Sequence, residues 1–194
     1  MSDSILGMIM GQLGGDRLKQ LGQQAGADEE QAKQGLGAAV PLLLGAMSRN
    51  ASDTDGAESL KGALERDHDG SILDNVQGLL GNPEQANGAG ILKHVLGGKR
   101  AGVEQQLGDH TGMGSASFGK LLEMAAPLVM GALGKQQRSL GLGSNQLSGF
   151  LDGEREQSES TGGFLGLVSN LLDADKDGSV VDDLAGMAGK LFGK

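Results

Sequence analysis

The sequence predicts an all-α, multihelical fold on three observations. Apolar residues recur with the spacing of one helix face, as in Ile5, Ile9 and Leu13, and no segment shows a sustained alternation with a period of two. With four Phe and no Trp or Tyr, the core must be built from Leu, Met, Ala, Val and Ile, which favours closely packed helices over aromatic-rich strands. The third observation is an internal duplication of a helical unit of about 86 residues.

The duplication is visible when the chain is aligned with itself at an offset of 86 residues. The identical pairs are Ile5-Leu6 and Ile91-Leu92, Gly11 and Gly97, Leu21-Gly22 and Leu107-Gly108, Gly26 and Gly112, Leu36 and Leu122, Pro41-Leu42 and Pro127-Leu128, and Gly45-Ala46 and Gly131-Ala132. Chance does not explain so many identities at one offset. We expect a first helical repeat over residues 1–86 and a second over residues 87–194, related by a pseudo-twofold axis. The two repeats could pack together as one domain.

Within the first repeat, residues 5–13 predict an amphipathic helix with one buried face. A further helix is expected to begin at Asp28, because Asp is a good N-cap and the acids that follow it complement the helix dipole. That helix carries an apolar run to Pro41. There we expect a kink or a new start, since proline lacks an amide donor and clashes with the preceding turn.

The second repeat shows the same order of elements, with a helix from Gly114 through Pro127 capped by Ser115 or Ser117. The acidic segments of the two repeats match at a larger offset of 108 residues, so the second repeat has 22 additional residues. We expect them to form a polar, flexible loop near residues 152–163.

The second repeat contains a calcium-loop-like motif in which Asp173, Asp175 and Asp177 alternate before Gly178. Calcium needs hard oxygen ligands that converge on one ion, and the glycine allows a sharp turn beneath it. An EF-hand has a bidentate Glu at its twelfth position, where this chain has Leu184. The expected Ca²⁺ ligands are therefore Asp173, Asp175, Asp177, Ser179, Asp182 and Asp183.

A degraded copy of this motif in the first repeat predicts a weaker second site. Its ligands would be Glu65, Asp67, Asp69, Ser71 and Asp74. The alternative for both loops is helix capping without metal, because Ser71 with Asp74, and Ser179 with Asp182, have the spacing of a capping box. Calcium is expected over magnesium, since several flexible carboxylates suit the larger ion.

Charge and composition exclude several classes of protein. The formal net charge of −9 and the lack of a basic stripe argue against nucleic-acid binding. The absence of cysteine excludes disulfides and thiolate metal sites. No basic signal segment opens the chain, and the longest apolar stretches are shorter than the roughly 20 residues of a membrane span. We therefore expect a soluble, cytoplasmic protein.

The expected function is a non-catalytic, calcium-binding helical protein that binds a protein partner or associates with itself as a homo-oligomer. The alternative is a metal-free helical scaffold whose acidic loops are only helix caps. A hydrolase using carboxylates such as Asp67 and Asp69 is the least favoured hypothesis, because nothing in this polar loop separates their pKa values. The three histidines are too dispersed for a zinc site and are interpreted as surface residues.

Three segments resemble the YidB-like family of bacterial proteins of unknown function. They are Gly90-Ile-Leu-Lys-His-Val-Leu-Gly-Gly, Met124-Ala-Ala-Pro127-Leu-Val-Met-Gly131-Ala-Leu-Gly, and Asp175-Lys-Asp-Gly-Ser-Val-Val-Asp-Asp183. The resemblance covers nearly the whole chain. It implies a multihelical fold and a bacterial source, and it implies no activity.

Overall fold

The computed structural model describes residues 4–159, with side chains up to Glu154, and no strand occurs within this range. Its elements are α1 (Ile5–Gln12), α2 (Asp16–Ala25), α3 (Glu29–Asn50), α4 (Thr54–Asp67), α5 (Ser71–Asp74), α6 (Val76–Gly81), the 3₁₀ turn η1 (Pro83–Ala86), α7 (Gly88–Leu96), the 3₁₀ turn η2 (Gly97–Lys99), α8 (Arg100–His110), α9 (Ser115–Leu140) and α10 (Ser144–Glu159). The predicted all-α class is confirmed for these residues.

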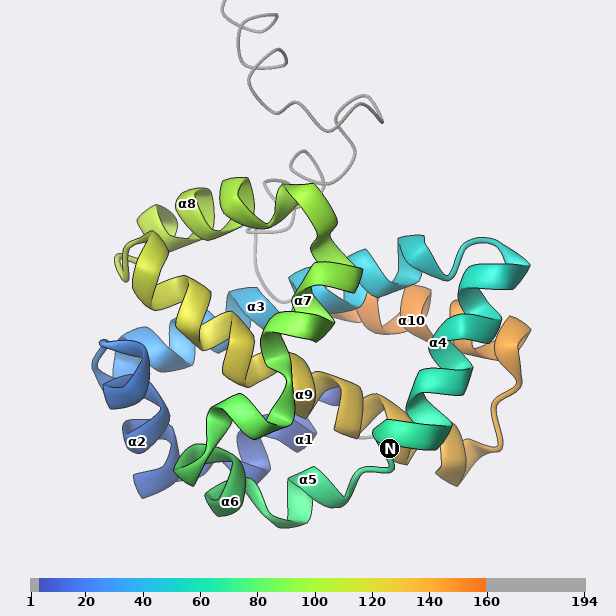
Figure 1. Cartoon of the computed structure of the whole chain (residues 1–194), viewed down its shortest axis with the longest axis horizontal. Coiled ribbons are helices and arrows are strands. Elements are labelled where there is room, and N and C mark those ends of the chain that lie inside the picture. Colours follow the sequence, from blue (N-terminus) through green and yellow to red (C-terminus); the bar gives the residue numbers. More distant parts are fainter. Residues whose placement is uncertain (1–3, 160–194) are drawn as a thin grey trace, which may run out of the picture.

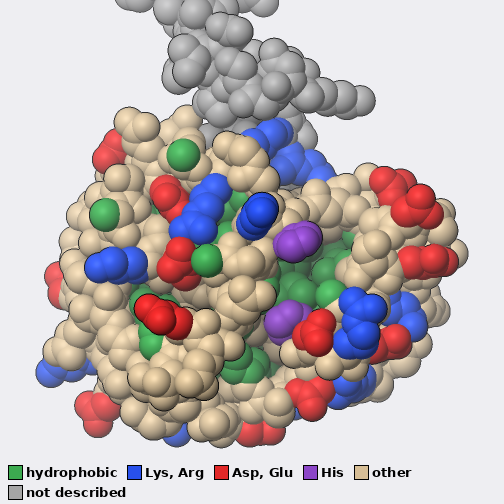
Figure 2. Space-filling view, viewed as in Figure 1, with side chains coloured by type: hydrophobic (Ala, Val, Ile, Leu, Met, Phe, Trp, Pro, Cys, Tyr) green, Lys and Arg blue, Asp and Glu red, His purple; other side chains and the backbone are tan. Residues whose placement is uncertain are grey.

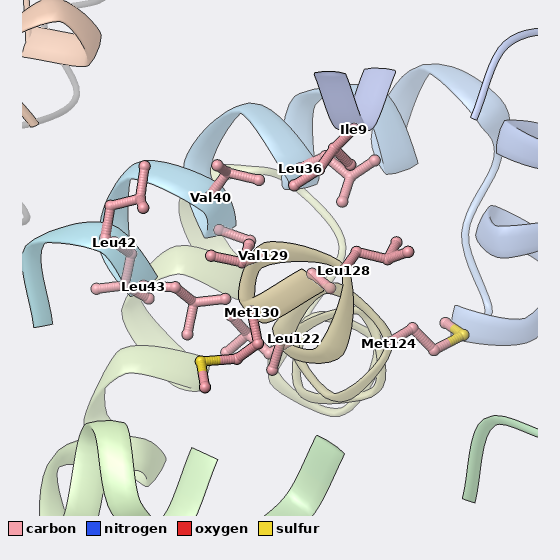
Figure 3. Packing of buried hydrophobic residues seen from close by; sticks show 14 of the residues in the cluster. Ile9, Leu36, Val40, Leu42, Leu43, Leu122, Met124, Leu128, Val129 and Met130 are labelled. Atoms are coloured by element: carbon pink, nitrogen blue, oxygen red, sulfur yellow. The ribbon is translucent and has the colours of Figure 1, made fainter. Parts of the chain in front are cut away.

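The long helices α3 and α9 form the centre of the described fold, and shorter helices surround them (Figure 1). Seen along α9, the side chains of Leu36 and Val40 on α3 face Val129 on α9 (Figure 3). All three are fully buried, and each such aliphatic side chain contributes roughly 1.5–3 kcal/mol relative to an exposed one. The full sequence has 36 glycines, many of them inside the described helices, so packing of this core rather than intrinsic propensity must stabilise these helices.

Helix α3 begins where the sequence predicted. Asp28 is its N-cap and forms a capping box, in which its Oδ1 accepts from the Gln31 amide at 2.8 Å and its own amide donates to Gln31 Oε1 at 3.1 Å. The N-cap predicted for α9, Ser115 or Ser117, was wrong. Its N-cap is Gly114, Ser115 is its first residue, and no side chain caps it.

Of the two outcomes expected at the internal prolines, a kink or a new helix start, the new start does not occur. Pro41 lies inside α3 and Pro127 inside α9, and both helices continue past them. A proline leaves the carbonyl four residues earlier without its amide donor. For Pro127 this is the carbonyl of Glu123, against which Gly88 packs so closely that a Cβ on Gly88 would lie 1.8 Å from the oxygen. Tertiary packing by Gly88 therefore covers the Glu123 carbonyl that lacks a helix hydrogen bond.

Contacts around the α3–α9 crossing come in matched pairs. Gln31 Nε2 on α3 donates to the Gly112 carbonyl at 3.1 Å, and Ser117 Oγ on α9 donates to the Gly26 carbonyl at 3.4 Å. Residue 117 follows residue 31, and residue 112 follows residue 26, by the same 86 positions. At the crossing itself, Gly35 lies against Leu121, its own counterpart at that offset.

We expected a loop near residues 152–163, but the described part of this polar segment is helical. Residues 152–159 continue α10, and residues 160–163 lie outside the described residues. Asp152 accepts a hydrogen bond from Ser48 of α3, and the buried Glu154 carboxylate accepts from the Ile5 amide of α1 at 2.9 Å. These partners hold the polar side of α10 on the core, which local composition does not reveal.

Candidate functional site: the first acidic loop and a cleft between α4 and α7

The first acidic loop joins α4 to α5. Glu65 and Asp67 lie in the last turn of α4, and Ser71 begins α5. Gly70 between them has φ +93°, a left-handed conformation that glycine adopts without steric cost. The glycine of the predicted calcium loop therefore does make a sharp turn.

The carboxylates of this loop bind groups of the protein itself. Asp69 Oδ1 accepts from the Ser71 amide at 2.9 Å, and the hydroxyl and amide of Ser71, with a smaller effect of Arg138, lower the pKa of Asp69. Glu65 accepts from Lys61 at 2.6 Å, and this hydrogen bond is the main cause that lowers its pKa. The N-cap of α5 is Gly70, no side chain caps this helix, and the predicted capping box of Ser71 with Asp74 does not form.

Arg138 of α9 lies where the loop turns. Its guanidinium donates to the Glu65 carbonyl at 3.1 Å and to the Asp69 carbonyl at 3.2 Å, and it approaches the Asp69 carboxylate at 3.9 Å. A fixed organic cation therefore binds the carbonyl and carboxylate oxygens of the first loop.

Close packing on α9 fixes the same loop. A Cβ on Gly134 would lie 1.8 Å from the His68 carbonyl oxygen, and a Cβ on Gly131 would lie 2.4 Å from Cγ2 of Ile72. Gly70 approaches Lys135 in the same way, at 2.9 Å between Cβ positions. The loop can lie this close to the helix only because these positions lack side chains.

Within the described residues, no group of three or more Asp, Glu, His or Cys side chains could hold a metal ion. In this structure Glu65 is paired with Lys61, and Asp69 with the Ser71 amide and Arg138. The expected main ligands, Asp173, Asp175, Asp177, Ser179, Asp182 and Asp183, lie outside the described residues.

A cleft of about 700 Å³ opens between α4 and α7 and extends to the end of α3 and to α9. Figure 2 shows it as a hollow with an apolar floor and histidine at its rim. The apolar residues that line it are Met47, Leu60, Ala63, Ile91, Val95 and Met130. Sequence analysis did not identify this site.

The residues that line the cleft follow the spacing of one helix face on both α4 and α7. Gly56, Leu60 and Ala63 are four and three residues apart on α4, so they share one face. Ile91 and Val95, also four residues apart, share a face of α7. Such spacing could have marked each face, but which two faces oppose each other depends on tertiary packing.

Two of the three histidines line the cleft, so their interpretation as plain surface residues was incomplete. His68 is half-buried, and burial lowers its pKa, with a smaller opposing effect of Asp67. His94 is exposed, and its Nδ1 lies 2.9 Å from the Gly90 carbonyl. Burial therefore favours the neutral form of His68, which keeps this wall of the cleft weakly polar.

The rim of the cleft carries both signs of charge. Arg49 and Arg66 contribute positive charge, and Asp53 and Asp67 contribute negative charge. Asp53 also caps α4 by accepting from the Gly56 amide at 2.7 Å. Among the described residues, no cleft side chains form a hydrogen-bonded nucleophile–base pair. The arrangement is suited to binding an amphipathic surface.

By length and composition alone, helix α9 is long and apolar enough to span a membrane. The sequence analysis had counted only shorter apolar stretches and did not identify this helix. However, 78% of its most apolar window is buried among the other helices. Its role as the central core helix accounts for its hydropathy.

Comparison with models of protein families identifies the family of this chain. The sequence model of a family described as "Bacterial protein of unknown function (DUF937)" matches residues 7–136, about two thirds of the chain. Neither a search of curated proteins nor a search of solved structures gives a match.

Proposed function

The chain belongs to the DUF937 family of bacterial proteins of unknown function, and we propose that it is a non-catalytic helical binding protein whose α4–α7 cleft receives an apolar helix of a protein partner. The observation that carries this proposal is the open cleft with six apolar lining residues. We also propose that, within this family, the chain is related to the YidB-like proteins.

The shape and chemistry of the cleft favour a protein segment as its ligand. Its volume lies within the roughly 300–1,000 Å³ typical of ligand sites. An amphipathic helix can lay apolar anchors on Leu60 and Val95 while its polar side meets Arg66 and Asp67 at the rim. Nucleic acid would need a basic rim, whereas this rim is mixed.

The proposed architecture is an internal duplication with a pseudo-twofold axis between α3 and α9. In a twofold arrangement, if residue i contacts residue j of the other copy, the counterpart of i contacts the counterpart of j. The hydrogen bonds of Gln31 and Ser117 follow this rule at the 86-residue offset. The contact of Gly35 with its counterpart Leu121 supports an axis near that point.

A second proposed function is calcium binding by the loop of Asp173, Asp175 and Asp177. A comparison of the repeats supports a difference between the loops. The first loop has the guanidinium of Arg138 bound to its oxygens, whereas the residue 86 positions before Arg138 is Ser52, which carries no charge. Because the second loop has three Asp and the equivalent position 52 has no charged side chain, we propose that calcium balances the charge of these carboxylates.

Calorimetric titration of calcium into the metal-stripped protein tests this second function. We expect one site, abolished by Asp177→Ala and retained in the matched variant Asp69→Ala. Absence of heat in the unmodified protein would leave the alternative, a metal-free scaffold or homo-oligomer with acidic helix caps.

Filling the cleft tests the main proposal. Ala63 lines the cleft, whereas Ala101 is exposed on α8 and lines none of it, so Ala63→Phe and Ala101→Phe form a matched pair. We expect the apolar dye anilinonaphthalene sulfonate to bind the unmodified protein and Ala101→Phe, and to bind Ala63→Phe much more weakly, with all three folded by circular dichroism. Equal dye binding by both variants would contradict the proposed cleft.

A further inference from the structure

One residue at the end of α3 contacts both walls of the cleft. Asn50 is the last residue of α3, and its side-chain Nδ2 donates to the carbonyl of Val95 at 3.1 Å and to that of His94 at 3.3 Å. Both carbonyls belong to the last turn of α7. Because the last carbonyls of a helix have no donor within it, the amide of Asn50 supplies a donor that the end of α7 lacks.

The main chain of the same residue contacts the other wall. A Cβ on Gly56 of α4 would lie 1.8 Å from the carbonyl oxygen of Asn50 and 3.0 Å from its carbonyl carbon. The first turn of α4 therefore lies against the end of α3 only because position 56 has no side chain. Asn50 and Gly56 both line the cleft, as do His94 and Val95. One end of the cleft is thus built around Asn50.

At the other end of the cleft, the two walls rest on α9. The first residue of α7, Gly88, packs against the carbonyl of Glu123, and the carbonyl of His68, which follows α4, packs against Gly134. Positions 123 and 134 are eleven residues apart in one helix, which corresponds to roughly 16 Å along its axis. Met130 lies between them in the sequence and lines the cleft.

This spacing is that of one helix placed between the walls. A helix that packs between two others needs its axis about 8–10 Å from each of theirs, so the walls must be about 16–20 Å apart. The roughly 16 Å between their contacts on α9 meets this requirement. At the opposite end, the last residue of α3 already lies between the same two walls. The cleft is therefore about as wide as one helix at both ends.

We infer that Asn50 is a positioning residue of the partner site, which sets the one-helix spacing of α4 and α7 by bonding one wall and contacting the other. The inference rests on the proposed function, because the spacing matters to binding only if the cleft receives a helix. It adds the residue that adjusts the cleft to this class of partner. Asn50→Asp is the isosteric test, since it removes both donors and places a carboxylate beside two carbonyls.

The distance between the walls can be measured directly, because the chain has no cysteine of its own. Glu58 on α4 and Lys93 on α7 are exposed and do not line the cleft, so Glu58→Cys with Lys93→Cys provides the two sites for spin labels. The matched control is Asn75→Asp, which makes the same change of charge outside the cleft. Asn75 Oδ1 accepts from the Gly78 amide at 3.1 Å, a bond that a carboxylate also accepts.

Double electron–electron resonance on the labelled full chain should give one narrow distance distribution, unchanged by Asn75→Asp and longer and broader with Asn50→Asp. The neutral apolar dye N-phenyl-1-naphthylamine should bind Asn50→Asp several-fold more weakly than the other two proteins. An unchanged distance in Asn50→Asp would overturn the inference, and so would an equal change in Asn75→Asp or a changed distance with unchanged dye affinity. If the dye does not bind the unmodified protein while the distance still responds, the proposed function fails and the spacing role of Asn50 stands.

A second variant acts on the same corner from the other wall. Gly56→Ala places a methyl group against the carbonyl of Asn50 and leaves the hydrogen bonds of Asn50 to α7 in place. We expect α4 to move away from the end of α3, which lengthens the distance between the labels. This variant covers the case in which Asn50→Asp does not fold, and an unchanged distance in it would overturn the inference.

Discussion

The substitution Gly134→Ala tests most sharply how the first acidic loop is held on α9. Position 134 is buried, and a Cβ there would lie 1.8 Å from the carbonyl oxygen of His68 and 3.0 Å from its carbonyl carbon. These are backbone atoms, so no side-chain rotation relieves the overlap. Either α4 and its loop move away from α9, or the helix distorts.

The magnitude follows from two opposing contributions. Replacing glycine by alanine in a helix interior stabilises by about 1 kcal/mol. Overpacking a tight contact costs about 1–3 kcal/mol, and an overlap this severe lies at the upper end. We expect a net loss of about 2 kcal/mol, which lowers Tm by about 4–8 °C for a chain of this size. The matched variant Gly37→Ala has open space around its Cβ and should raise Tm by about 2–4 °C.

Thermal unfolding followed by far-UV circular dichroism measures both variants, and urea unfolding checks that the m-value is unchanged. The two alanines differ only in what their methyl groups meet. If Gly134→Ala is as stable as Gly37→Ala or as the unmodified protein, the close approach of the loop to α9 is wrong.

Three further predictions concern named side chains. Arg138→Ala should lower Tm by about 2–4 °C, because two hydrogen bonds to loop carbonyls are lost, together worth about 1 kcal/mol at this exposed site, and hydrogen exchange should rise in residues 65–72. Burial lowers the pKa of His68 in the folded protein, so stability should fall as the pH drops through the unfolded value of 6.5 towards the folded one, and His68→Gln should reduce that fall in urea midpoints. Arg100→Gln should lower Tm by about 2–6 °C, because Arg100 bonds Glu104 and Glu123 at 2.5 Å each in a partly buried site, and added salt should shrink the difference.

Local patterns predicted much of the fold. The spacing of Ile5, Ile9 and Leu13 gave a correct helical segment, and the N-cap at Asp28 is confirmed with its full capping box. The new helix start predicted as one outcome at Pro41 does not occur, because the cost of proline inside a helix is local, whereas burial of both halves of α3 is a tertiary gain. Residues 152–159 were misread for a similar reason, since long-range bonds rather than composition hold α10.

The candidate site was less predictable. The motif around Asp69 correctly marked a turn with a left-handed glycine, but it does not reveal Arg138, which binds the Asp69 carbonyl from 69 residues away along the chain. The cleft depends on how α4 and α7 are placed, and no short motif records that placement. Its lining residues are ordinary apolar helix residues, which sequence analysis assigns to the core.

The most direct measurement of the central claim is site-specific photo-crosslinking in bacterial cells. A photoreactive amino acid placed at Ala63 lies in the cleft, and the same amino acid at Ala101 lies on exposed α8 outside it. The account predicts a discrete adduct of the full chain with another polypeptide from position 63 and none from position 101. No adduct from position 63, or the same adducts from both positions, would contradict a binding function for the α4–α7 cleft.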